Sequence, residues 1–171
     1  MNGLAFRRTL PQASHNVWLK WCRGSGLGNL HVGWGGEGWL SFGRGMVLLT
    51  PTREVLLVNG VHFPGVDDPM VVELLTLREA ILWCLGHGFS AVRFEGDAQL
   101  VIEKIRRGKS ADSRMGPILE EVSNLVVAHA GLSVRFVGRR NNRIAHLVAR
   151  KTLSLYPTTS HFFDFQTWPW I

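Results

Sequence analysis

The sequence predicts an α/β domain built on a mixed, five-stranded sheet flanked by helices. Three apolar, β-prone runs come first, at residues 30–36, 43–50 and 54–63, and residue types typical of turns separate them. Helical patterns then alternate with short strand patterns along the rest of the chain. Strands joined by short turns pair antiparallel, whereas strands reached through a helix commonly pair parallel. The sheet is therefore expected to begin with three antiparallel strands and to continue with strands of mixed direction.

The three expected N-terminal strands are read from alternation and from turn residues. The stretch "LHVGWGG" alternates, with Leu30, Val32 and Trp34 on one face. The runs "GRGMVLLT" and "EVLLVNGVHF" are joined by "PTR", which is typical of a hairpin turn. Together these segments predict an antiparallel meander.

The segment "MVVELLTLREAILWCLGHG" predicts a long helix over residues 70–88. A glycine ends it, and its apolar residues fall on one broad face, namely Met70, Leu74, Leu77, Ile81, Cys84 and Leu85. The chain then predicts a strand at 91–97, helices at 98–108 and 115–131, a strand at 132–140 and a helix at 141–155. Asn141 or Asn142 is a natural N-cap for the last helix.

The length of 171 residues and the composition, 46% hydrophobic and 19% charged, indicate one globular domain with a core. We expect a lead-in at 1–29, the domain at 30–155 and an aromatic tail at 156–171, which either packs back on the domain or docks on a partner. No apolar run approaches the roughly 20 residues of a membrane helix, so we expect no membrane association. We also expect the chain to be a monomer. Two cysteines form no disulfide framework, which favours the nucleus or cytoplasm, with an organelle as the alternative.

Positive charge is concentrated in the C-terminal half of the chain. The formal net charge is +6, and the segment 104–151 alone carries eleven basic and three acidic residues. Such an excess suits a polyanionic partner, because phosphate contacts release counterions and supply affinity. The alternative is an ordinary solvated basic face.

Two acids occupy positions that suit metal chemistry. Glu73 lies at the edge of the apolar stripe of the long helix, and Asp97 stands where a strand ends and a helix begins. Separately, Glu73 is explained by the helix dipole and Asp97 by an N-cap. Together they are expected near the carboxyl ends of the strands, where ligand sites collect. Two converging carboxylates there could bind a hard divalent cation such as Mg²⁺.

The segments "VELLTLREAILWCLGHGFSAVRFEGDAQLVIEKI" and "SVRFVGRRNNRIAHLVARK" resemble the plant ribonuclease H-like proteins, which are reverse-transcriptase-related RNase H type-1 domains. The resemblance covers roughly residues 30–153 and implies the RNase H-like fold. It also implies two-metal hydrolysis of the RNA strand of an RNA–DNA hybrid, in which four acids hold two Mg²⁺ ions. Two of those acids match the family motif, as Glu73 on the helix and Asp97 at the strand end.

The other two acidic positions depart from the family pattern. Gly33 in "LHVGWGG" stands where the first aspartate is expected, and the nearest acid, Glu37, comes four residues later. His146 stands at the last position, where an imidazole suits Zn²⁺ or Mn²⁺ better than Mg²⁺. His146 could equally be a half-exposed helix histidine. With Glu73 and Asp97 as the only anionic ligands, we expect one weakly held Mg²⁺ or Mn²⁺ at most and slow or no hydrolysis.

Three functions follow as hypotheses. The first is an active RNA–DNA hybrid ribonuclease with Glu73, Asp97 and His146 as its catalytic residues. The second is a catalytically impaired RNase H-like domain that binds an RNA–DNA hybrid or RNA through Arg139, Arg140 and Arg143. The third is a protein-interaction or structural domain in which the basic surface is incidental.

Overall fold

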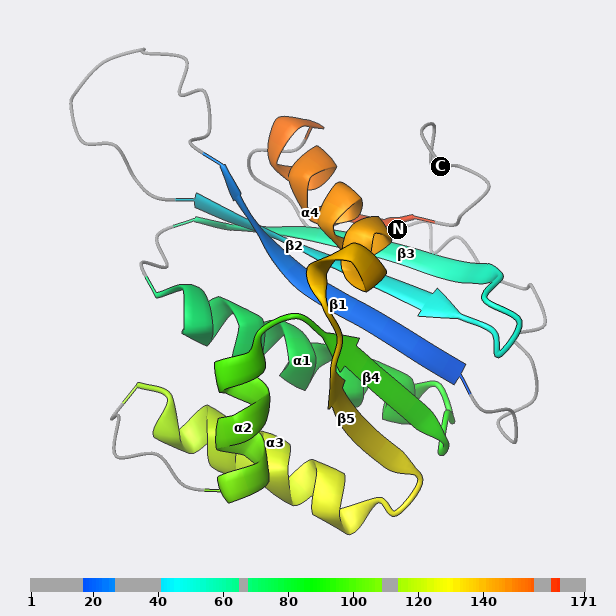
Figure 1. Cartoon of the computed structure of the whole chain (residues 1–171), viewed down its shortest axis with the longest axis vertical. Coiled ribbons are helices and arrows are strands. Elements are labelled where there is room, and N and C mark those ends of the chain that lie inside the picture. The colour runs from blue at the N-terminus through cyan, green and yellow to red at the C-terminus, as the bar shows by residue number, and fades with distance from the viewer. Residues whose placement is uncertain (1–16, 27–40, 65–67, 109–113, 156–160, 164–171) are drawn as a thin grey trace, which may run out of the picture.

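The computed structural model describes residues 17–26, 41–64, 68–108, 114–155 and 161–163 (Figure 1). They form one mixed sheet with the strand order β5-β4-β1-β2-β3-β6. β1, β2 and β3 pair antiparallel in sequence, whereas β4 is parallel to both β1 and β5. The mixed sheet of five strands expected from the sequence is confirmed as β1 to β5, and β6 adds a sixth strand next to β3. The strands are β1 (Val17–Gly26), β2 (Ser41–Leu49), β3 (Val55–Pro64), β4 (Val92–Gly96), β5 (Leu132–Phe136) and β6 (His161–Phe163).

The first strand of the sheet lies earlier in the chain than predicted. The sequence pattern favours 30–36 as this strand and 1–29 as a lead-in, but β1 is formed by Val17–Gly26, so that prediction is wrong. Residues 30–36 lie outside the residues described by the structure. The reason is physical: β1 lies between β4 and β2 and is covered on both faces, so it lacks the apolar–polar alternation of a half-exposed strand.

Helices cover both faces of the sheet (Figure 1). α1, α2 and α3 lie on one face and α4 on the other, and a turn of 3₁₀ helix, η1, leads into α4. The four predicted helices are found, and their ends differ from the predicted ones by at most three residues. The helices are α1 (Pro69–Gly86), α2 (Gln99–Arg107), α3 (Gly116–Ala128), η1 (Arg139–Asn142) and α4 (Arg143–Leu155).

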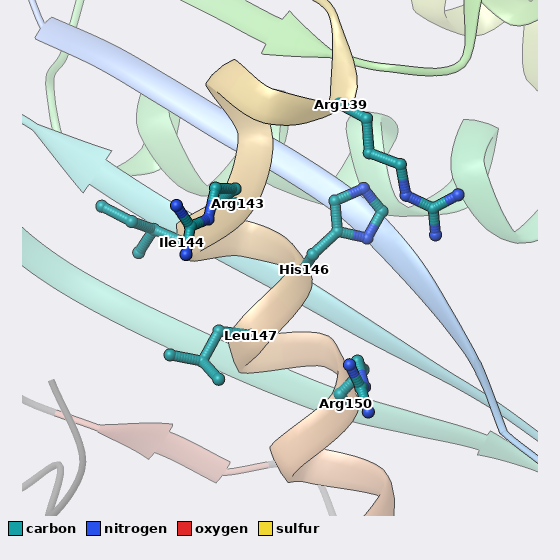
Figure 2. Close-up of a pocket in the computed structure, with 6 residues that line it drawn as sticks. All are labelled: Arg139, Arg143, Ile144, His146, Leu147 and Arg150. Atoms are coloured by element: carbon teal, nitrogen blue, oxygen red, sulfur yellow. The ribbon is translucent and has the colours of Figure 1, made fainter.

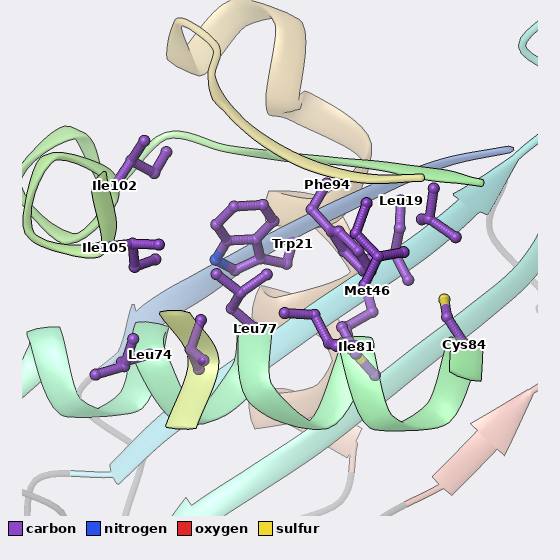
Figure 3. Close-up of a cluster of buried hydrophobic side chains, with 14 of the residues drawn as sticks. Leu19, Trp21, Met46, Leu74, Leu77, Ile81, Cys84, Phe94, Ile102 and Ile105 are labelled. Atoms are coloured by element: carbon purple, nitrogen blue, oxygen red, sulfur yellow. The ribbon is translucent and has the colours of Figure 1, made fainter. Parts of the chain in front are cut away.

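The main core lies between the sheet and α1, α2 and α3 (Figure 3). Trp21 of β1 is completely buried there and packs against the neighbouring strand at Gly96. A Cβ at Gly96 would collide with the Trp21 ring, so glycine is required at this position. Because Gly96 directly precedes Asp97, the packing of Trp21 fixes the backbone from which the Asp97 side chain projects.

A second, smaller core lies on the opposite face under α4. Its buried members are Val47, Leu49, Val58, Ala145, Val148 and Ala149. The backbone of α4 approaches β2 so closely that a Cβ at Gly45 would collide with the carbonyl oxygen of Ala145. One side of α4 is therefore pressed on the sheet, and the other side faces outward.

Part of the aromatic tail packs back on the domain. β6 pairs antiparallel with β3, with Phe163 opposite Val58 and His161 opposite Gly60. The remainder of the tail lies outside the part of the chain that the structure describes. Among the described helices, none is long and apolar enough to cross a membrane.

Candidate functional site

Asp97 lies at the carboxyl end of β4, and both of its carboxylate oxygens accept hydrogen bonds from the η1–α4 segment. His146 Nε2 lies 2.7 Å from Oδ2, and Asn142 Nδ2 lies 2.8 Å from Oδ1. An ionised carboxylate can only accept hydrogen bonds, so Nε2 of His146 carries a proton. Asp97 and His146 were predicted to belong to one site, and the structure brings them into direct contact.

The surroundings of Asp97 act on its pKa in opposite directions. Burial raises the pKa, whereas the hydrogen bonds from His146 and Asn142 lower it, and the net result is a lowered pKa. Asp97 is therefore ionised at neutral pH. It is not the N-cap of α2, because that position is Ala98 and no side chain caps the helix. The explanation of Asp97 as a helix cap is thus wrong.

Asn142 is the residue of this site whose role the sequence did not reveal. Its side chain is completely buried, and Nδ2 donates both to Asp97 Oδ1 and to the backbone oxygen of Trp21, at 2.8 Å each. Asn142 thereby joins β1, the end of β4 and the start of α4. Its Oδ1 accepts no hydrogen bond within the described residues, so Asn142 does not cap α4 as predicted. An asparagine before a helix signals a cap, and its tertiary partners leave no trace in the local pattern.

Glu73 lies in the second turn of α1 and is buried, with 5% of its surface exposed. The start of α1 is fixed by Asp68, whose Oδ1 accepts a hydrogen bond from the amide of Met70 at 2.8 Å, and by Pro69 in the first turn. Glu73 and Asp97 line one hollow of about 360 Å³, together with Arg139 and His146.

The residues of this hollow do not match the four-acid, two-cation site that the resemblance implies. Among the described residues, no group of three or more His, Cys, Asp or Glu side chains is arranged to hold a metal ion. Both Asp97 oxygens are engaged by protein donors, and His146 Nε2 is protonated and directed at Asp97 rather than presenting a lone pair. Glu73 and Asp97 remain the two carboxylates that could contact a cation.

The first acidic position has no carboxylate in β1. Trp21 is paired with Gly96, so the part of β1 nearest to Asp97 begins at Cys22. The whole strand reads "VWLKWCRGSG" and contains neither Asp nor Glu. The assignment of this position to Gly33 therefore does not hold, because the first strand is β1. Gly33 and Glu37 lie outside the described residues.

A buried ion pair stands beside the site and was not predicted. Lys20 Nζ of β1 lies 2.6 Å from Glu95 Oε2 of β4, and both side chains are nearly inaccessible to solvent. The two residues are register partners in the parallel ladder. Lys20 thus neutralises Glu95 within the sheet, and this ion pair joins β1 to β4 instead of leaving Glu95 available as a ligand. The separation of 75 residues between the partners hides this pair from sequence patterns.

The arginines predicted to bind nucleic acid are all exposed, and Arg139 lines the same hollow as Asp97. Arg139 and Arg140 belong to η1, and Arg143 is the first residue of α4. Arg139 and His146 line the hollow with Glu73 and Asp97, and they also line a second hollow along α4 (Figure 2). None of these three arginines forms an ion pair with a carboxylate of the described residues.

Comparisons with known proteins agree with this fold. The family model described as reverse transcriptase-like matches residues 40–152. No curated protein matches the chain. Among solved structures, RNase H1 from the halophilic archaeon Halobacterium salinarum is similar with a TM-score of 0.65 and 17% identity, over 81% of this chain and 97% of that one.

Two further structures show the same likeness. The N-terminal RNase H domain of a Mycobacterium tuberculosis protein, solved as a fusion with maltose-binding protein, has a TM-score of 0.65 and 18% identity, over 82% of this chain and 94% of that one. LC11-RNase H1 in complex with an RNA/DNA hybrid has a TM-score of 0.63 and 13% identity, over 80% of this chain and 95% of that one. At such identities the shared property is the fold, and the expected RNase H-like fold is confirmed.

Proposed function

The chain belongs to the reverse transcriptase-like family and has the RNase H-like fold, and from this premise we propose that it is a nucleic-acid-binding domain with impaired or no hydrolytic activity. The bound ligand is an RNA–DNA hybrid or RNA. The contact surface is the η1 turn and the start of α4, where Arg139, Arg140 and Arg143 are exposed and Arg139 lines the hollow of Asp97 and His146.

The observation that carries the proposal is the position of unpaired arginines at the acidic hollow. Some arginines of the described chain lie against carboxylates, as Arg44 does with Glu79 and Arg78 does with Glu121. The η1 arginines have no such partner, and Arg139 lines the hollow that contains the two acids matching the family motif, Glu73 and Asp97. Exposed guanidinium groups are suited to phosphate oxygens, which they contact through paired hydrogen bonds. The LC11-RNase H1 complex with an RNA/DNA hybrid supports the choice of a hybrid as the ligand.

Impaired hydrolysis follows from the charges available to hold cations. Two neighbouring dications repel each other strongly, and a two-metal site offsets this with several carboxylates. Here β1 supplies none, and Asp97 already accepts hydrogen bonds at both oxygens. Glu73 and Asp97 would hold one Mg²⁺ or Mn²⁺ ion weakly, and such an ion would supply charge neutralisation near a phosphate.

Binding tests this proposal through its dependence on salt. The double variant Arg139→Ala/Arg140→Ala should bind a labelled RNA–DNA hybrid more weakly, and the slope of log affinity against log salt should fall by about 0.9 for each lost phosphate contact. The matched control is Arg106→Ala/Arg107→Ala, which removes the same charge from exposed positions on α2. Equal effects of the two variants would indicate a diffuse field of charge and would contradict a specific contact at η1.

Cleavage is measured on the same hybrid, end-labelled, with Mg²⁺ and with Mn²⁺. We expect the wild-type chain to cleave no faster than the variant Glu73→Gln/Asp97→Asn. Clear cleavage that the double variant loses would show a working site and would overturn the proposed impairment. If neither binding nor cleavage is found, the chain is a protein-interaction or structural domain instead.

A further inference from the structure

The outward side of α4 carries a groove that lies beyond the acidic hollow. It has a volume of about 580 Å³ and is lined by Arg139, Arg143, Ile144, His146, Leu147 and Arg150. Figure 2 shows these side chains projecting from η1 and α4, with Ile144 also packed against the core under α4. Positions 143, 147 and 150 recur at the spacing of one helix face, so basic and apolar groups alternate along it.

The charge of this groove is uncompensated within the described part of the chain. No carboxylate lines it, and Arg139, Arg143 and Arg150 make no ion pair there. Three cations facing one groove repel one another, and a bound polyanion would relieve that repulsion. The aliphatic groups between them, Ile144 and Leu147, leave an apolar floor, with Leu147 39% exposed.

The groove is continuous with the acidic hollow. Arg139 and His146 line both, so they stand at the junction between Glu73 and Asp97 on one side and α4 on the other. From Arg143 to Arg150 the helix rises about 10 Å, at about 1.5 Å per residue. The two arginines are therefore far enough apart to contact different phosphates of one strand.

We propose that α4 carries a second phosphate-binding track, along which the backbone of the bound nucleic acid continues from η1 past Arg143 to Arg150. Arg143 and Arg150 bind different phosphates of one strand, and Ile144 and Leu147 contact the sugars between them. This inference rests on the proposed nucleic-acid binding and adds to it the direction of the strand and the residue Arg150, which sequence reasoning counted only as part of the basic segment.

The test combines a salt titration with crosslinking to a labelled RNA–DNA hybrid. Arg150→Ala should lower the slope of log affinity against log salt by about 0.9, which amounts to a roughly threefold smaller loss of affinity between about 50 and about 200 mM salt. Arg107→Ala, an equally exposed arginine on α2, is the control and should have a smaller effect. A chain with photo-reactive benzoylphenylalanine in place of Leu147 should crosslink to the hybrid.

The outcomes separate this inference from the proposed function. If Arg139→Ala/Arg140→Ala weakens binding but Arg150→Ala behaves as Arg107→Ala and position 147 yields no crosslink, the nucleic acid leaves η1 in another direction and the α4 track is refuted. If Arg139→Ala/Arg140→Ala also leaves binding unchanged, the proposed function fails as well. A reduced slope for Arg150→Ala together with a crosslink from position 147 supports the track.

Discussion

The charged groups of this molecule divide into two regions that behave differently. At the carboxyl end of β4, Glu95 is paired with Lys20 of the neighbouring strand β1, and Asp97 accepts hydrogen bonds from Asn142 and His146. Along η1 and the outer side of α4, exposed arginines have no carboxylate partner in the described structure. The charged groups at the end of β4 therefore stabilise the fold, whereas the arginines of η1 and α4 remain accessible to a ligand. Three predictions test this division.

The largest expected effect comes from the buried pair. Lys20→Met leaves Glu95 buried without its counter-charge, and we expect the free energy of unfolding to fall by about 3–5 kcal/mol. Lys20→Met/Glu95→Leu removes both charges and should recover most of that loss, because an apolar pair avoids desolvation of ions. Urea unfolding followed by circular dichroism measures both changes.

The control for that prediction is a surface pair of the same type. Arg78 Nε lies 2.6 Å from Glu121 Oε2, but the two side chains are 33% and 41% exposed. Arg78→Ala should therefore lower the free energy of unfolding by no more than about 1 kcal/mol. If Lys20→Met cost no more than Arg78→Ala, the charges at the strand ends would not be structural in the sense argued above.

An intermediate effect is expected from Asp97→Asn. Whether this substitution lowers or raises the free energy of unfolding distinguishes two roles of Asp97. If Asp97 joins β4 to α4, Asp97→Asn loses hydrogen bonds to an ionised acceptor and should lower stability by about 1.5–3 kcal/mol. If Asp97 is held in a site built for cations, where acids repel one another, the same change should raise stability. We expect the loss, and chemical unfolding with and without Mg²⁺ measures it.

The pH dependence of that loss follows from the lowered pKa of Asp97. A carboxyl group with a lowered pKa contributes stability that is complete above its unfolded value, near 3.8, and that disappears as the pH falls through the folded value below it. The difference in stability between the wild-type chain and Asp97→Asn should therefore be constant near neutral pH and shrink only below pH 3.8. A difference that vanished between pH 5 and 7 would contradict this assignment.

The sequence predicted the parts of the fold that depend on local pattern. The helix α1 shows its apolar stripe at helical spacing, and the hairpin turn at "PTR" joins β2 and β3 as expected. The strand β1 was missed because its second face is buried by tertiary contacts, including Lys20, whose partner lies 75 residues away. The stretch at 30–36, which lies outside the described residues, shows clearer alternation in its sequence. Apolar–polar alternation predicts central strands poorly, because both of their faces are buried.

The site shows the same limit. Glu73 and Asp97 were found through residue type and position and His146 through the family resemblance, and the structure places all three around one hollow. Asn142 was interpreted as a cap because capping is its common local use. Its actual bonds, to Trp21 and Asp97, join segments that lie far apart in the chain, and no pattern within a single segment could reveal them.

The smallest effect concerns the cost of keeping arginine at the start of α4. Arg143 is the first residue of the helix, where the positive end of the helix dipole disfavours a cation, and it makes no ion pair within the described residues. Arg143→Ala should therefore raise the free energy of unfolding by about 0.3–1 kcal/mol at low salt while weakening binding to the RNA–DNA hybrid. Thermal unfolding and fluorescence anisotropy measure the two quantities on the same protein. A residue that lowers stability yet supports binding is explained by its ligand, whereas a loss of stability in Arg143→Ala would make Arg143 a structural residue and remove it from the second region.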